Sequence, residues 1–263
     1  MAAAAIEFAG VSYALPRGQL LLRNIALTLE AGSITALLGR SGSGKTTLLR
    51  MVNGLIQPTS GHVLVGGRSS ATDLLMLRRS IGYVIQETGL FPHRRIASNV
   101  GMPLEIAGAS KQDESYQAAI RHVMQQVGLE PDLFADRFPW QLSGGQRQRA
   151  GVARALVSDP EVLLMDEPFG ALDPLTRAEM QAMLRDLLAT VRKTVLLVTH
   201  DLPEALYLAE RVIFLDAGEV VADLRSAEVY GSSNPHVRRY VEALRRSLPN
   251  SADPAAPPAA SPS

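Results

Sequence analysis

The chain has 263 residues, of which 46% are hydrophobic, and its Lys+Arg and Asp+Glu totals are both 26. This length suits one large domain or a core domain with an inserted subdomain. A formal net charge of zero argues against a general nucleic-acid binder, which usually carries a basic excess. The absence of cysteine excludes disulfides, thiolate zinc sites and cysteine nucleophiles.

The chain shows neither a transmembrane span nor a secretion signal. No stretch approaches the roughly 18 consecutive apolar residues that a membrane-spanning helix needs. The opening Met1–Ala5 lacks a basic region and is soon followed by Glu7. We therefore expect a cytoplasmic protein that would reach a membrane only through a partner.

The predicted elements alternate between strands and helices. Residues 6 to about 30 read as short strands with a turn at 16–18. Unbroken apolar runs then predict parallel strands buried on both faces, at 34–38, 81–85, 162–165, 195–198 and 212–215. Apolar residues at three- and four-residue spacing predict helices over 111–127 and 180–191. This alternation indicates an α/β fold with a mainly parallel sheet and an N-terminal antiparallel β subdomain.

We expect residues 1–245 to form one domain, because only the remainder lacks an apolar pattern. Within it, residues from about 87 to 157 are mostly helical and loop-like, which predicts an inserted helical subdomain. Residues 246–263 are predicted to be a disordered tail, since 250–263 are rich in Pro, Ala and Ser.

A glycine-rich segment after the strand 34–38 matches G-x-x-x-x-G-K-[ST], from Gly39 to Thr46. Glycines let the backbone wrap around phosphates with several N–H groups pointing inward, and the following helix adds its positive N-terminus. Lys45 would bridge the β- and γ-phosphates, and Thr46 would bind Mg²⁺. The residues expected around the phosphates are Gly39, Arg40, Ser41, Gly42, Ser43, Gly44, Lys45, Thr46 and Thr47.

Two carboxylates follow the apolar run 162–165. Asp166 and Glu167 would emerge at the carboxyl end of a buried strand, where α/β proteins place their ligands. We expect Asp166 to hold Mg²⁺ through water and Glu167 to polarise the water that attacks the γ-phosphate. A carboxylate after an apolar strand is common by itself, and the nearby phosphate loop is what favours the functional interpretation.

Four further side chains have both a functional and a structural interpretation. Gln86 ends the run 81–85 and would bind Mg²⁺ or the attacking water, or be a polar loop residue. His200 follows the run 195–198 and would sense the γ-phosphate, while Asp201 and Glu204 form the pattern of a helix capping box. Tyr13 would stack on adenine or sit half-buried in a strand. Asp173 precedes Pro174 and would cap a helix, touch a partner subunit, or do both.

The segment Leu142–Gln146 predicts a second anion site. Ser143, Gly144, Gly145 and Gln146 look like the N-terminal edge of a helix with free N–H groups. Arg147 and Arg149 are expected to be solvated or interdomain charges rather than phosphate ligands. One domain is unlikely to bring this segment and the loop 39–46 onto the same nucleotide. We therefore expect a protein that closes around ATP as a dimer.

These residues, in this order, resemble the ATP-binding subunits of ABC transporters over about residues 6–240. The resemblance includes Tyr13, the Walker A loop 39–46, Gln86, the signature 142–146, Asp166 with Glu167, the loop 171–173 and His200. It implies that ATP and Mg²⁺ bind between the Walker A loop of one protomer and the signature of the other. A homodimer with two hydrolytically competent sites follows from it.

Segments 53–61 and 81–93 look like those of bacterial importers of glycine betaine, choline and related osmoprotectants. Methionine, amino-acid and lipid-trafficking importers remain alternatives, and a non-transport ABC ATPase is the rival class. An importer implies membrane permease subunits, an indirect link to a substrate-binding protein, and a place on the cytoplasmic face of the inner membrane. We expect Leu90–Glu105 to contact the permease, so that a charge at Phe91 or Ile96 would uncouple transport.

Overall fold

A six-stranded mixed sheet forms the centre of the protein in the computed structural model, which describes residues 2–16, 18–86 and 88–247. Arg17 of the expected turn and the expected tail from residue 248 onward lie outside the described residues. The strand order is β10-β9-β3-β8-β7-β6, with β10 alone antiparallel to its neighbour. The strands are β3 (Ile34–Gly39), β6 (Ile81–Val84), β7 (Val162–Asp166), β8 (Thr194–Thr199), β9 (Arg211–Asp216) and β10 (Glu219–Arg225).

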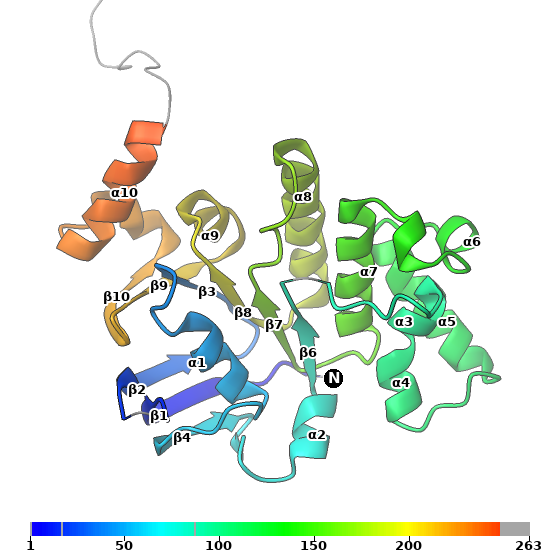
Figure 1. The fold of residues 1–263 in the computed structure, drawn as a ribbon, viewed down its shortest axis with the longest axis horizontal. Helices are drawn as coiled ribbons and strands as arrows, with labels where there is room; N and C mark the ends of the chain where they lie inside the picture. The colour runs from blue at the N-terminus through cyan, green and yellow to red at the C-terminus, as the bar shows by residue number, and fades with distance from the viewer. Residues whose placement is uncertain (1, 17, 87, 248–263) are drawn as a thin grey trace, which may run out of the picture.

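A second, antiparallel sheet lies beside α1 (Lys45–Val52), with the order β2-β1-β4-β5 (Figure 1). Its strands are β1 (Ile6–Ala14), β2 (Leu20–Leu29), β4 (Ser60–Val65) and β5 (Arg68–Ser69). Their buried apolar residues form one core with those of α1 and with one side of the parallel strands, including Leu37, Leu164 and Leu196. The helix after the phosphate loop is therefore held between two sheets.

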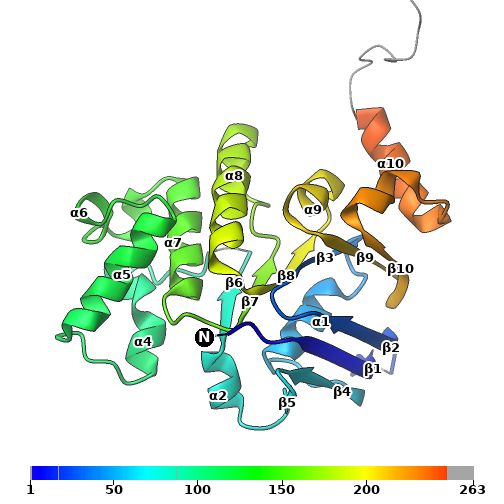
Figure 2. The ribbon, with the colours of Figure 1, turned by 180° about the vertical axis from the view of Figure 1, so that it is seen from behind.

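The segment predicted to be a helical insertion contains a group of helices beyond β6, at the end of the sheet opposite β10 (Figures 1 and 2). They are α3 (Ile96–Val100), α4 (Met102–Ile106), α5 (Glu114–Gln126), α6 (Pro131–Phe134), the short 3-10 helix η1 (Pro139–Gln141) and α7 (Gly144–Leu156). Their apolar faces share a core with α8 (Pro174–Val191) and with the second face of the parallel sheet, through Leu163, Met165 and Leu197. The insertion is thus built onto the sheet through α7 and α8.

The remaining helices are α2 (Leu74–Arg79), which precedes β6, α9 (Leu202–Leu208), the 3-10 helix η2 (Ser226–Gly231) and α10 (Pro235–Ser247). The last of these runs two residues past the expected domain boundary at 245. The α/β fold with a mainly parallel sheet and an antiparallel β subdomain is confirmed. Among the described residues, no helix is both long and apolar enough to cross a membrane.

The topology decides where the chemistry lies. Because β3, β6, β7 and β8 run parallel, their carboxyl ends meet at one edge of the sheet. The phosphate loop follows β3, and Gln86 comes two residues after β6. Asp166 and Glu167 stand at the end of β7, and His200 follows β8 directly.

Candidate active site at the carboxyl edge of the sheet

The loop between β3 and α1 requires glycine at particular positions. A Cβ at Gly39 would stand 2.4 Å from the carbonyl oxygen of Leu215, closer than any side chain tolerates. Gly44 caps α1 with a φ of 101°, and a Cβ there would stand 2.6 Å from Leu22. The loop is therefore pressed against its neighbours, and its backbone N–H groups are held near the start of α1.

Lys45 begins α1 and is only 5% exposed. Its Nζ donates to the carbonyl oxygens of Gly39 at 2.8 Å and Arg40 at 3.0 Å. Burial lowers the pKa of Lys45, while the nearby carboxylates of Glu167 and Asp166 act in the opposite direction. The ammonium group is thus folded back onto its own loop, within reach of an anion that the loop would hold.

Asp166 is buried at the end of β7 and receives two hydroxyl groups. Thr46 Oγ1 donates to Asp166 Oδ1 at 2.9 Å, and the Tyr83 hydroxyl contacts Asp166 Oδ2 at 3.4 Å. Sequence reasoning predicted the Thr46–Asp166 neighbourhood but missed Tyr83. In the apolar run 81–85 this tyrosine reads as core, and only the pairing of β6 with β7 brings its hydroxyl to the carboxylate.

Glu167 has a φ of +46°, in the left-handed region that side chains with a Cβ rarely adopt. Its carboxylate lies between two polar side chains from neighbouring strand ends. Gln86 Nε2 donates to Glu167 Oε2 at 3.4 Å, and His200 Nδ1 lies 3.3 Å from Glu167 Oε1. Of the three residues expected to perform the hydrolytic chemistry, Glu167 therefore contacts both of the others, and His200 remains 62% exposed.

The predicted capping box at residues 201–204 is only half formed. Asp201 Oδ1 accepts from the backbone N–H of Glu204 at 2.9 Å, as expected of an N-cap. The Glu204 side chain does not return this contact to the start of the helix. Instead it is buried, with 5% exposure, in a small cavity behind His200 that Arg177 also lines.

The segment 142–146 opens α7 with a complete capping box. Ser143 Oγ accepts from the N–H of Gln146 at 3.2 Å, and Gln146 Oε1 accepts from the N–H of Ser143 at 2.9 Å. The two arginines that follow bind carbonyl groups, Arg147 that of Leu142 and Arg149 that of Val127, each at 2.6 Å. Both guanidinium groups are therefore half-buried and bound to backbone carbonyls, whereas they were expected to be solvated or interdomain charges.

The two segments predicted to bind phosphate stand on separate elements of the chain. The helix α7 packs against β6, α3 and α5, whereas α1 packs against β4 and the strands β3, β7 and β8. In both views α7 stands apart from α1, with α8 and sheet strands between them (Figures 1 and 2). The signature segment therefore opens a helix on the other side of α8 from the phosphate loop.

Two of the ambiguous residues take structural positions that are compatible with either interpretation. Tyr13 is half-buried on β1, opposite Leu22 of β2. Asp173 caps α8, with Oδ1 accepting from the N–H of Thr176 at 3.1 Å and Pro174 in the first turn.

The arrangement of a phosphate loop, a strand-end carboxylate pair and a separate capped signature helix matches one known family. The sequence profile described as "ABC transporter" covers residues 22–170. The chain belongs to the ABC transporter family. It is 42% identical over 212 residues to the choline transport ATP-binding protein OpuBA of Bacillus subtilis (strain 168), which covers 80% of this chain and 55% of that protein.

Further members of the ABC transporter family support the same assignment. The chain is 45% identical over 217 residues to the glycine betaine uptake system ATP-binding protein YehX of Escherichia coli (strain K12), which covers 82% of this chain and 69% of that protein. Its structure is similar, with a TM-score of 0.75 and 33% identity, to a dimeric post-hydrolysis state of the ATP-binding cassette MJ0796 bound to ADP and Pi. That similarity covers 84% of this chain and 98% of that cassette. The chain spans about half the length of the first of these relatives.

Proposed function

We propose that this chain binds and hydrolyses ATP as the energy-coupling subunit of a bacterial importer. The observation that carries the proposal is the contact of Glu167 with both Gln86 and His200, beside a buried lysine in a phosphate loop. In this arrangement Glu167 would orient and polarise the attacking water. His200 would contact the γ-phosphate, and Lys45 would leave its loop carbonyls for the phosphate oxygens.

The residues beside the loop suit a magnesium ion that is shared with the nucleotide. Mg²⁺ prefers oxygen ligands and usually keeps several waters, with only one or two protein ligands beside substrate phosphates. The Thr46 hydroxyl and the Asp166 carboxylate, 2.9 Å apart, fit this requirement. Gln86 offers its amide oxygen as a further ligand, since its nitrogen faces Glu167. When bound, the ion would neutralise charge that develops on the phosphates.

The signature helix would complete the site of a second protomer. Ser143, Gly144, Gly145 and Gln146 form the N-terminal end of α7, which packs against β6, α3 and α5, whereas the phosphate loop precedes α1, which packs against β3, β4, β7 and β8. In a homodimer in which each signature segment faces the other protomer's ATP, both the phosphate loop and the signature segment of each chain would contact a nucleotide. The similarity to a cassette that is described as dimeric supports the formation of a dimer.

The test uses the full chain and its Glu167→Gln variant. With ATP and Mg²⁺, we expect wild type to hydrolyse ATP and the variant to bind it, turn over very slowly and run as a dimer in size-exclusion chromatography with light scattering. The same variant with ADP should remain a monomer. Near-normal turnover by Glu167→Gln would remove this residue as the base, and a monomer in ATP would refute the dimer.

An apolar groove supports the proposal that the chain docks onto a membrane permease. It lies between α2, β6, α4 and α7 and is lined by residues that include Leu75 and Ile106, which are 56% and 61% exposed. Phe91, at 40% exposure, belongs to the neighbouring segment 90–105 that was expected to contact the permease. Ile96 does not serve that purpose, because it is fully buried in the core of the helical group.

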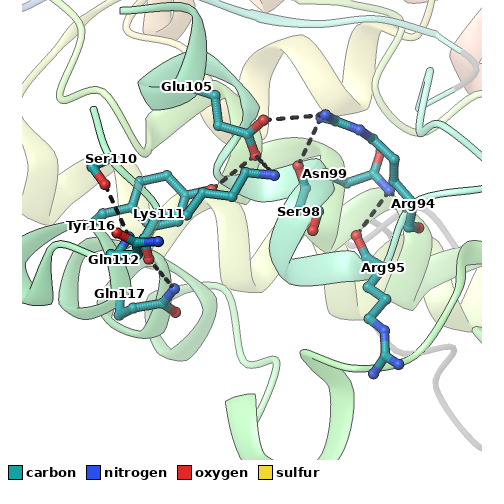
Figure 3. A network of polar contacts seen from close by, with 10 residues as sticks. All are labelled: Arg94, Arg95, Ser98, Asn99, Glu105, Ser110, Lys111, Gln112, Tyr116 and Gln117. Atoms are coloured by element: carbon teal, nitrogen blue, oxygen red, sulfur yellow. Dashed lines mark hydrogen bonds and ion pairs between the residues drawn. The ribbon is translucent and has the colours of Figure 1, made fainter. Parts of the chain in front are cut away.

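The segment 90–105 is held by a network of polar contacts (Figure 3). Asn99 is fully buried and binds the N–H and carbonyl of Phe91 and the carbonyls of Arg94 and Arg95. The carboxylate oxygens of Glu105 lie 3.0–3.2 Å from the Arg94 guanidinium, the Lys111 ammonium and the Tyr116 hydroxyl. A preorganised segment of this kind would transmit movement of the helical group to a bound permease.

We propose an osmoprotectant, such as glycine betaine or choline, as the transported substrate. The support is the similarity to proteins named for choline transport and glycine betaine uptake. The complete importer would place this subunit on the cytoplasmic face of the inner membrane, with a binding protein selecting the substrate. Uptake of labelled choline and glycine betaine by cells that express the chain with its permease and binding protein tests this. Uptake of methionine instead of both would refute it.

A further inference from the structure

A small cavity lies directly behind His200, between α8 and α9. Its walls include the carboxylates of Glu167 and Glu204, the guanidinium of Arg177, and residues Thr199 to Asp201. Glu167 and His200 already have roles in the proposed hydrolysis. Glu204 and Arg177 have none, although each is a charged residue directed into the same space.

Both of these side chains contain a buried polar atom without a hydrogen-bond partner among the described residues. In Glu204 the atom is Oε1, and in Arg177 it is Nε. A buried polar group without a partner is unfavourable, and an apolar side chain at position 204 would match its neighbours Leu202, Ala205 and Leu208, which are all buried. A glutamate at this position therefore needs an explanation beyond packing.

The electrostatics indicate that Glu204 responds to the groups around the cavity. Burial raises the pKa of Glu204 to about 7, whereas Thr199 and Arg177 act to lower it and Asp201 and Glu167 act to raise it. The carboxylate thus interacts with the N-cap of its own helix, with α8 and with the end of β7. It is placed where its charge can hold Arg177.

Arg177 connects this cavity to the loop before α8. Its Nη2 donates to the carbonyl oxygen of Leu172 at 3.2 Å, and its own N–H binds the carbonyl of Asp173. On the other side, the Thr199 hydroxyl accepts from the N–H of Asp201 at 3.0 Å, which fixes the turn that carries His200. The pair therefore lies between the loop 171–173 and the histidine.

We propose that Glu204 and Arg177 are positioning residues, which together hold His200 in a fixed position relative to Glu167 and to the loop 171–173. This inference rests on the proposed ATP hydrolysis, because it assigns the pair a role in that reaction. The ionised Glu204 attracts the Arg177 guanidinium across the cavity and so braces the turn 199–201 against α8. Neither residue is assigned a contact with the nucleotide.

The test measures single-turnover ATP hydrolysis by the full chain, together with steady-state kcat and KM. Glu204→Gln keeps the shape of the side chain and removes its charge, and Arg177→Met removes the other charge. We expect each variant to lower kcat about tenfold with KM for ATP unchanged, because an interaction made through His200 acts on the chemical step rather than on binding. Glu210→Gln, an exposed carboxylate just after the same helix, is the matched control and should behave as wild type.

A double-mutant cycle with His200→Ala separates positioning from a general structural role. If Glu204 acts through His200, Glu204→Gln should slow His200→Ala no further, and single-turnover rates resolve this even at low activity. The inference would be overturned if Glu204→Gln lowered the single-turnover rate of His200→Ala as much as it lowers that of wild type. A kcat of Glu204→Gln within twofold of wild type would also overturn it. If Glu204→Gln fails to fold, Arg177→Met provides the same comparison. A wild-type chain that does not hydrolyse ATP would instead refute the proposed function.

Discussion

Removing the buried charge of Glu204 should stabilise the protein, and the gain should depend on pH. The carboxyl is 5% exposed, and burial is the largest cause of its raised pKa of about 7. Below the ordinary value of 4.5 it is protonated in the folded and unfolded states alike, so its burial costs little. Above pH 7 it is ionised in both states, and the folded state then carries a poorly compensated charge. Folding stability due to this group therefore falls as pH rises from 4.5 to 7.

The magnitude follows from the two pKa values. The difference between about 7 and 4.5, at roughly 1.4 kcal/mol for each pH unit, corresponds to about 3 kcal/mol. Glu204→Gln has nearly the same shape and does not ionise. We expect the variant to exceed wild type in free energy of unfolding by up to about 3 kcal/mol at pH 8, and by only about 1 kcal/mol at pH 5.5.

Urea unfolding followed by circular dichroism, without nucleotide, at both pH values measures this difference. Glu210→Gln is again the control, since its carboxylate is exposed and should change stability little at either pH. A variant that is less stable than wild type at pH 8 would refute the reasoning, as would an equal gain at both pH values. Combined with the kinetic test above, the expected result is a more stable but slower enzyme.

Three further predictions concern the phosphate loop 39–46, the segment 90–105 that is proposed to contact the permease, and the buried Asn99 that supports this segment. Lys45→Ala should abolish measurable nucleotide affinity in a titration with a fluorescent ATP analogue, because the buried ammonium binds two carbonyl oxygens of the phosphate loop; wild-type affinity would contradict its role. Phe91→Asp should leave ATP hydrolysis by the isolated chain intact but abolish substrate uptake with the permease, and normal uptake would exclude this side chain from the interface. Asn99→Ala removes a fully buried amide with four hydrogen bonds and should lower the free energy of unfolding by about 2–4 kcal/mol. An effect below about 0.5 kcal/mol, typical of a surface change, would show that other contacts hold the loop.

Local patterns were sufficient to predict the fold class and the edge at which the site lies. Buried parallel strands leave unbroken apolar runs, and the residues that follow such runs reach the same edge whatever the details of packing. The loop geometry requires glycine at positions 39 and 44, and both glycines can be recognised in the sequence as part of the motif 39–46. All of these features are set by residues that lie close together in the sequence.

Features that depend on tertiary packing were not predictable in this way. Tyr83 reads as an apolar-strand residue until β7 is placed beside it, and Ile96 looks like a surface residue until the helical group forms around it. Glu204 illustrates the same limit, because a glutamate three residues after Asp201 has the spacing of a capping box. Only the packing of α9 against α8 turns its side chain into the cavity.

The positive φ of Glu167 has a consequence for protein engineering. An L-residue in the left-handed region costs roughly 1 kcal/mol relative to glycine, whose backbone adopts that region freely. A library selected for thermal resistance alone would therefore be drawn towards glycine at position 167, whereas selection for the proposed ATP hydrolysis would favour glutamate there. Folding stability and the proposed activity therefore favour different residues at position 167, and thermostabilised variants should be sequenced there first.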